Sequence, residues 1–210
     1  MDYSKQIAEK LLQCKAIKLQ PSEPFTWASG WKSPIYCDNR KTLAFPEIRS
    51  YIKNAFGEII KEKFPKFDVI AGVATGAIAQ GALVADELTK PFCYIRSAPK
   101  DHGLTNLIEG DLQSGQKVVV VEDLISTGGS SLKAVEAIRN AGAEVVGMVA
   151  IFTYGFPTAI ENFKNANVKL IALSNYNALI ELALETGYVK NEQVEVLKKW
   201  REAPDKWEIK

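Results

Sequence analysis

Short apolar runs alternate with helical patterns along the middle of this chain, and this alternation restricts the fold more than any other feature. The runs are bounded by glycine or polar residues, and they cover residues 69–73, 92–95, 118–121, 145–152 and 168–173. Runs of this length without a polar face are typical of strands that are buried on both sides. Helical stretches lie between several of them, at residues 76–88, 130–141 and 156–164. This order predicts an α/β fold, a doubly wound parallel sheet of about five strands with flanking helices.

The two ends of the chain carry further helical patterns around this core. Residues 3–13 place apolar side chains at helical spacing, and Pro46 opens a second helix with an apolar stripe. Two more helical patterns follow at residues 178–184 and 194–200. We therefore predict a single domain over residues 1–210. Its core would cover about residues 45–174, and a small hood would form from about residues 1–40 and part of residues 175–210.

Charge and cysteine content argue against several classes of function. Lys and Arg total 26 while Asp and Glu total 25, so no global field attracts nucleic acid or an anionic membrane, and we expect neither as a partner. The first residues lack the apolar centre of a signal peptide, and no run approaches the roughly 20 apolar residues of a spanning helix, which predicts a cytoplasmic protein. Cys14, Cys37 and Cys93 are scattered, as free thiols are. Because the chain has one histidine, His102, a Cys-His nucleophile stays a formal alternative.

The most informative motif is VVVVEDLISTGGSS, at residues 118–131. Its small residues, at positions 126–130, let backbone N–H groups converge at a helix N-terminus, where a phosphate binds well. Glu122 and Asp123 beside such a cradle would repel a phosphate, so we expect them to face hydroxyl groups or a cation. A ribose diol with a bound Mg²⁺ meets that requirement. The alternative is a buried strand before a hydroxyl-capped helix, with both acids simply solvated.

This motif resembles the ribose-phosphate signature of the type I phosphoribosyltransferases. The resemblance implies that Glu122 and Asp123 hold the ribose hydroxyls and that residues 125–130 wrap the 5-phosphate. It also implies that the loop GVATGA, at residues 72–77, lies under the pyrophosphate of the sugar donor. The residues of this segment expected to bind 5-phosphoribosyl-1-pyrophosphate are Glu122, Asp123, Leu124, Ile125, Ser126, Thr127, Gly128, Gly129 and Ser130.

A long polar segment, residues 94–112, is too long for an ordinary tight connection. It resembles the catalytic loop of orotate phosphoribosyltransferases. The resemblance implies that Lys100 contacts the pyrophosphate and the transition state, and that Arg96 and His102 also touch the sugar donor, from the neighbouring subunit of a homodimer. We predict Lys100, His102 and Asp123 as the catalytic residues. Ser97 stands where many members carry a second basic residue. The alternative is a flexible surface loop whose charges only keep it solvated.

The segment PFTWASGWKSPIYCDNRK, at residues 24–41, is similar to the substrate hood of the orotate enzymes. Some members have a lysine at the position of Ala28 and an arginine near Tyr154 that binds the orotate carboxylate, and both are absent here. Ser126 matches a family position that contacts orotate. We predict Lys32 and Arg40 as the replacement cations, with surface charge or a structural role as the alternative. The aromatic residues of this segment are expected to pack within the hood rather than to stack on the base.

The resemblance therefore implies transfer of a phosphoribosyl group to orotate, with Mg²⁺ bound mainly through the substrate and no metal site made by the protein itself. Two alternatives remain open at this stage. One is salvage of a purine or of uracil, because those enzymes share the ribose-phosphate signature. The other is a ligand-sensing regulator that keeps the fold without turnover.

Overall fold

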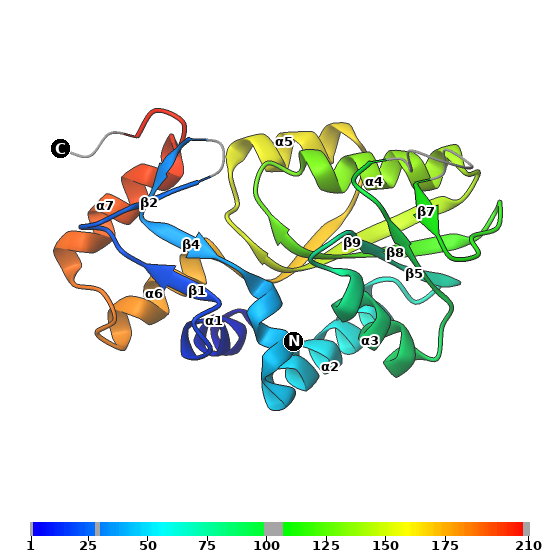
Figure 1. Cartoon of the computed structure of the whole chain (residues 1–210), viewed down its shortest axis with the longest axis horizontal. Coiled ribbons are helices and arrows are strands. Elements are labelled where there is room, and N and C mark those ends of the chain that lie inside the picture. Colours follow the sequence, from blue (N-terminus) through cyan, green and yellow to red (C-terminus); the bar gives the residue numbers. More distant parts are fainter. Residues whose placement is uncertain (1, 28–29, 99–106, 208–210) are drawn as a thin grey trace.

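A six-stranded sheet forms the centre of the molecule in the computed structural model, which describes residues 2–27, 30–98 and 107–207 (Figure 1). The spatial order is β10-β9-β8-β5-β6-β7. The strands are β5 (Val69–Val73), β6 (Phe92–Ile95), β7 (Ile108–Glu109), β8 (Lys117–Ile125), β9 (Glu144–Thr153) and β10 (Leu170–Asn175). Five of them pair in parallel, and β7 pairs antiparallel with β6.

The central strands are buried on both faces, as their unbroken apolar runs predict. Every residue of β5 is buried, and Val118 to Val121 of β8 have no exposed surface. Val69 pairs with Val118 and Gly72 with Val121, so β5 and β8 run in the same direction and β8 continues past the end of β5 to Ile125. The segments that follow these two strands are therefore brought to the same edge of the sheet.

Two layers of helices cover the sheet (Figure 1). One face carries α4 (Gly129–Asn140) and α5 (Pro157–Asn165), and the other carries α2 (Pro46–Lys63) and α3 (Ile78–Leu88). The apolar stripe of α2 packs into the core, where Ile48, Ile52, Phe56 and Ile60 are all buried. Each face of the sheet has its own cluster of buried side chains.

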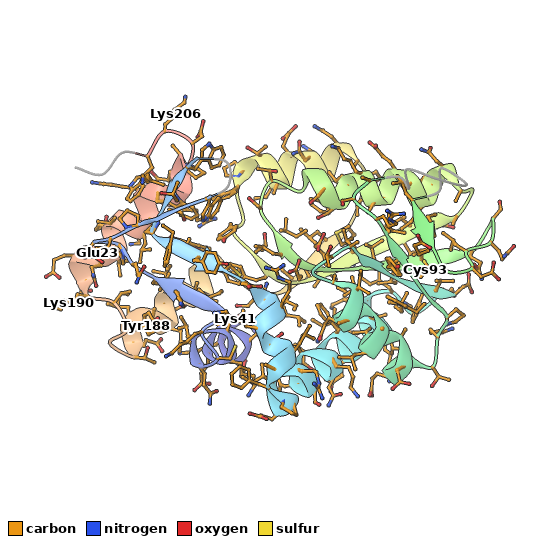
Figure 2. The ribbon with its side chains drawn as sticks, viewed as in Figure 1. Glu23, Lys41, Cys93, Tyr188, Lys190 and Lys206 are labelled. Atoms are coloured by element: carbon orange, nitrogen blue, oxygen red, sulfur yellow. The ribbon has the colours of Figure 1, made fainter. Side chains whose placement is uncertain are left out.

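The hood combines both ends of the chain at one end of the molecule. Its elements are α1 (Ser4–Gln13), β1 (Ile17–Leu19), β2 (Phe25–Thr26), β3 (Lys32–Ser33), β4 (Ile35–Cys37), α6 (Tyr176–Glu185) and α7 (Asn191–Glu202). In Figure 2, Glu23 from the first part of the chain lies at the same end as Tyr188 and Lys190, far from Cys93 of β6. A 3-10 helix, η1 (Asn39–Ala44), leads from the hood to α2. The hood shares a continuous apolar cluster with one face of the sheet.

The observed fold is the predicted α/β class, with differences in its smallest elements. The sheet has six strands rather than about five, because β7 lies within residues 94–112, which were read as a loop. Residues 21–39, where the sequence shows no strand pattern, contain three short strands that belong to two small antiparallel sheets. Strands of two or three residues leave no periodic pattern for a sequence to display. Within the described ranges, no helix is both long and apolar enough to cross a bilayer.

Candidate active site

The predicted phosphate cradle lies where β8 ends and α4 begins. Gly128 adopts a left-handed conformation with φ of +82°, and a Cβ there would lie 2.6 Å from Cε2 of Phe163, so only glycine fits. Asn162 Nδ2 donates a hydrogen bond of 3.0 Å to the carbonyl of Thr127, which fixes the loop from outside. Within the described part of the chain, no side chain caps α4. Its first N–H groups therefore stay available to a phosphate.

The cradle residues differ in what they present to a ligand. Ile125 is fully buried and its carbonyl accepts a hydrogen bond of 3.1 Å from the N–H of Tyr154, so it shapes the loop from below. Ser126 and Thr127 are half-buried, whereas Gly129 and Ser130 are exposed. The surface of the cradle is therefore formed by the backbone of Gly129 together with the hydroxyl-bearing residues Ser126, Thr127 and Ser130.

The two acids have different environments. Glu122 is only 5% exposed, and its carboxyl accepts hydrogen bonds from Ser131 Oγ at 2.8 Å and from the N–H of Asp123 at 3.0 Å. Burial, reinforced by the nearby charge of Asp123, raises the pKa of Glu122 to about 8. Asp123 is half-buried, so it is the more accessible member of the pair at the strand end.

Asp123 lies against the loop that was predicted to hold the pyrophosphate. A Cβ on Gly76 would come within 2.2 Å of Asp123 Oδ2, so the carboxylate occupies the space that a side chain at Gly76 would need. The same loop contains a cis peptide bond between Ala74 and Thr75. From the other side, Asn39 Nδ2 donates a hydrogen bond of 2.6 Å to the carbonyl of Asp123. The acid, the cradle and this loop thus meet at one edge of the sheet.

A cavity of about 340 Å³ adjoins the cradle beneath the hood. Its walls come from β2 to β4, from the end of β8 and from the loop after β9, and it is lined by Thr26, Trp27, Tyr36, Cys37, Leu124, Ser126 and Tyr154. Ser126 belongs both to this cavity and to the cradle. Planar aromatic walls of this kind suit a heterocyclic base. A larger hollow of about 540 Å³, between α6 and α7, shares no residue with the cradle or the acid pair.

The aromatic residues of the hood pack against one another, and two of them, Trp27 and Tyr36, also line the cavity. The ring of Trp27 lies 5.4 Å from that of Tyr154, 5.6 Å from that of Trp200 and 6.4 Å from that of Trp31, measured between centroids. Phe25 packs on Tyr36 at 5.6 Å. Burial holds the pKa of Tyr154 well above its usual range, so it faces the cavity as a neutral phenol.

The two predicted replacement cations lie in different settings. Lys32 is exposed and its Nζ donates a hydrogen bond of 2.8 Å to Thr26 Oγ1, a side chain that lines the cavity. Arg40 pairs instead with Asp38, with 2.7 Å between Nε and Oδ1, and its side chain is 60% exposed. Hydrogen bonding from Arg40 lowers the pKa of Asp38. The structure therefore links Lys32, but not Arg40, directly to the wall of the cavity.

The predicted catalytic loop, residues 94–112, is called the lid below, and described residues on its two sides contact each other. The N–H of Arg96 donates a hydrogen bond of 2.8 Å to the carbonyl of Leu107, and Arg96 Nη1 lies 3.5 Å from Glu109 Oε1. Together with the antiparallel pairing of β6 and β7, these contacts hold Arg96 beside Leu107 at the base of the loop. Ser97 is exposed at its start. Lys100 and His102 lie outside the described residues, as does Ala28, so their predicted roles stay predictions.

A cysteine nucleophile is disfavoured by the environments of the three thiols. Burial raises the pKa of Cys14, raises that of Cys37 well above its usual range, and raises that of Cys93 to about 11. Thiols with raised pKa values are poor nucleophiles at neutral pH. All three are free cysteines.

Sequence reasoning missed several residues that shape this site. Asn39, which holds the backbone of Asp123, and Ser131, which holds Glu122, were not singled out as partners. Gly76 was seen only as part of a loop, although its missing side chain makes room for Asp123. Asn39 stands in a conspicuously polar stretch, CDNRK, but nothing in its neighbours indicates a partner 84 residues away.

The fold and the site are those expected of a phosphoribosyltransferase, and comparison with known families shows that the chain belongs to this class. Residues 42–184 match the family model for the phosphoribosyl transferase domain. The chain belongs to the orotate phosphoribosyltransferase family within this class, as its similarity to full-length relatives shows.

These relatives cover nearly the whole chain. The orotate phosphoribosyltransferase of Phocaeicola vulgatus is 67% identical over 204 residues, which is 97% of this chain and 96% of that protein. That of Lactococcus lactis subsp. cremoris is 59% identical over 208 residues, covering 99% of this chain and all of the relative. The crystal structure of orotate phosphoribosyltransferase from Aeropyrum pernix superposes with a TM-score of 0.74 at 27% identity, covering 88% of this chain and 99% of that one.

Proposed function

We propose that this chain transfers the phosphoribosyl group of 5-phosphoribosyl-1-pyrophosphate to orotate, giving orotidine 5-monophosphate and pyrophosphate in pyrimidine nucleotide synthesis. The observation that carries this proposal is the position of Ser126, which belongs to both the phosphate cradle and the aromatic cavity. A sugar phosphate in the cradle and a planar base in the cavity would therefore be neighbours. Holding two reactants in this way removes much of the entropic cost of their reaction.

The residues of the site suit charge separation at C1 of the ribose. As the bond to pyrophosphate breaks, the ribose becomes positive and the leaving group becomes more negative. The charged Asp123 complements the sugar, while the loop at residues 72–77 and the cations of the lid would receive the pyrophosphate. Orotate carries its negative charge on the carboxylate. As the bond from its ring nitrogen to C1 forms and the bond from C1 to pyrophosphate breaks, the proton on that nitrogen leaves to the departing pyrophosphate or to water. Glu122, held by Ser131 and by the N–H of Asp123, would lie with Asp123 beside the ribose hydroxyls.

Magnesium fits this arrangement through the substrate. Asp123 offers hard carboxylate oxygens of the kind that Mg²⁺ prefers, next to the loop at residues 72–77. No group of three His, Cys, Asp or Glu side chains in the described ranges forms a metal site. When bound, the ion would neutralise part of the charge of the pyrophosphate. Asp123 would orient the ribose hydroxyls or a water molecule beside it.

The assembly that we propose is a homodimer in which the lid of one subunit, with Lys100 and His102, completes the site of the other. The described residues on either side of this loop are joined by the pairing of β6 with β7 and by the hydrogen bond from the N–H of Arg96 to the carbonyl of Leu107. We place the protein in the cytoplasm. Its three free thiols are typical of a reducing compartment.

A screen of bases tests the proposed function. With 5-phosphoribosyl-1-pyrophosphate and Mg²⁺, we expect pyrophosphate release with orotate and little or none with uracil, xanthine, hypoxanthine or adenine. Turnover of a purine or of uracil in preference to orotate would replace the proposal with base salvage. Tight binding of the ligands without turnover would instead favour a sensing role.

Lys32 is the cation best placed for the orotate carboxylate, because it alone of the two candidates is bonded to a cavity-lining side chain. We expect Lys32→Ala to raise the KM for orotate about tenfold or more, as for loss of a hydrogen bond to a charged group. The KM for the sugar donor should change little. Steady-state kinetics with each substrate varied in turn measures both values.

Arg40→Ala serves as the matched control, since it removes another exposed hood cation whose charge is engaged by Asp38. Its effect on the KM for orotate should be smaller than that of Lys32→Ala. Equal rises in both KM values for the Lys32 variant would assign Lys32 a structural role. A larger effect at Arg40 would transfer the carboxylate contact to that residue.

A further inference from the structure

Two neighbouring residues of α7 hold residues of the base cavity from behind without lining it. The lining includes Trp27 of the hood and Tyr154 of the loop after β9, whose rings contact each other with 5.4 Å between centroids. Trp200 and Arg201 bond to backbone carbonyls behind these two residues, and neither belongs to the cavity lining.

Trp200 holds the hood wall. Its side chain has no exposed surface, and its Nε1 donates a hydrogen bond of 3.1 Å to the carbonyl of Lys32 in β3. The indole also packs edge-on against Trp27, with 5.6 Å between ring centroids. Because β3 pairs with β2, the strand that carries Thr26, this contact fixes the strand pair that forms one side of the cavity.

Arg201 holds the turn that carries Tyr154. Its Nε donates a hydrogen bond of 3.1 Å to the carbonyl of Tyr154, and its Nη2 donates one of 3.2 Å to the carbonyl of Gly155. Its Nη1 donates to Asn177 Oδ1 at 2.5 Å, which aligns the guanidinium. Two N–H groups of one planar side chain thus fasten the turn that presents the Tyr154 ring, and a third ties the side chain to α6.

We infer that Trp200 and Arg201 of α7 are positioning residues that hold Trp27 and Tyr154 in the wall of the base cavity. Trp200 acts through the β2 and β3 pair and through its ring contacts with Trp27 and Tyr154. Arg201 acts through the turn at Tyr154 and Gly155. A planar base that packs against these rings loses contact area when either ring shifts. The phosphate cradle is built on β8 and α4, and it meets this turn at the hydrogen bond from the N–H of Tyr154 to the carbonyl of Ile125. The inference rests on the proposed function for the identity of the base.

The test separates base binding from sugar-donor binding in the full-length enzyme. We expect Arg201→Ala to raise the KM for orotate about tenfold with less than a twofold change in the KM for the sugar donor. Arg201→Lys, which keeps the charge but loses the fork of donors, should give an intermediate rise. Trp200→Phe keeps an aromatic ring and removes only the Nε1 donor, so it should raise the KM for orotate in the same selective way.

Lys199→Ala is the matched control, because it removes one exposed charge from the same last turn of α7. Its kinetics should equal those of the wild type. Thermal unfolding and gel filtration report whether each variant folds, and Arg201→Lys and Trp200→Phe keep the test valid should Arg201→Ala unfold. An unchanged KM for orotate in these folded variants, or an equal rise in both KM values, would overturn the inference. A wild-type enzyme that ignores orotate would instead refute the proposed function.

Discussion

Asp123→Asn should lower kcat by about 100-fold or more while the protein stays folded, a loss comparable to removal of one strong electrostatic contact in other active sites. The amide keeps the size of the side chain and can still accept a hydrogen bond, but it carries no charge. Burial raises the pKa of Glu122, whereas Asp123 is half-buried and is the more accessible acid of the pair. Single-turnover and steady-state assays, with thermal unfolding as the check on folding, measure the effect.

A second variant displaces the carboxylate of Asp123 without changing Asp123 itself. Gly76→Ala places a methyl group where Asp123 Oδ2 now lies, so the carboxylate must rotate away, and we expect a loss of kcat in the same direction. Gly57→Ala in α2 adds the same methyl group with only an ordinary contact of 3.4 Å to Cγ of Glu87, so activity should persist. Wild-type turnover by Asp123→Asn would remove this residue from the chemistry.

Mixed dimers should restore activity that neither parent has. Lys100→Ala would lack a working lid but keep its cradle, and Asp123→Asn would have the opposite defect. If the lid serves the partner's site, a dimer with one subunit of each kind has one complete site. With random exchange half of the dimers are mixed, so activity should recover to about a quarter of the wild-type value. Activity assays before and after subunit exchange measure the recovery.

Exchange must be demonstrated independently, for example with two tags of different mass followed by native mass spectrometry. Mixing wild type with either variant sets the scale for a dimer that has one good site. Proven exchange with no recovery would mean that the lid works within its own chain, or that Lys100 has no catalytic role.

The parts of the fold that sequence predicts well are those whose signal is local and periodic. The buried runs of β5 and β8 and the stripe of α2 repeat over many residues, and the structure confirms them. The two residues of β7 carry no such repeat, and their pairing with β6 is a long-range event. The short strands of the hood were missed for the same reason.

The residues of the site also differ in how well the sequence predicts them. The cradle at residues 126–130 is one contiguous segment, so its residues can be read together from the sequence. The contacts that hold its surroundings join distant positions, such as Asn39 with Asp123 and Trp200 with Lys32. Every residue has a backbone carbonyl that can accept a hydrogen bond, so the residue type at the accepting position does not reveal the contact.

The hydrogen bond from Trp200 to Lys32 spans 168 residues, and this separation has a consequence for biosynthesis. During translation the strands of the sheet and the phosphate cradle emerge before α7, and domains tend to fold as their N-terminal parts become available. Closing so long a loop is slow and entropically costly until other contacts have formed. A nascent chain would thus complete the wall of the base cavity only after α7 has left the ribosome and packed against the hood. A chain whose translation stops before α7 would lack the contact from Trp200 to Lys32.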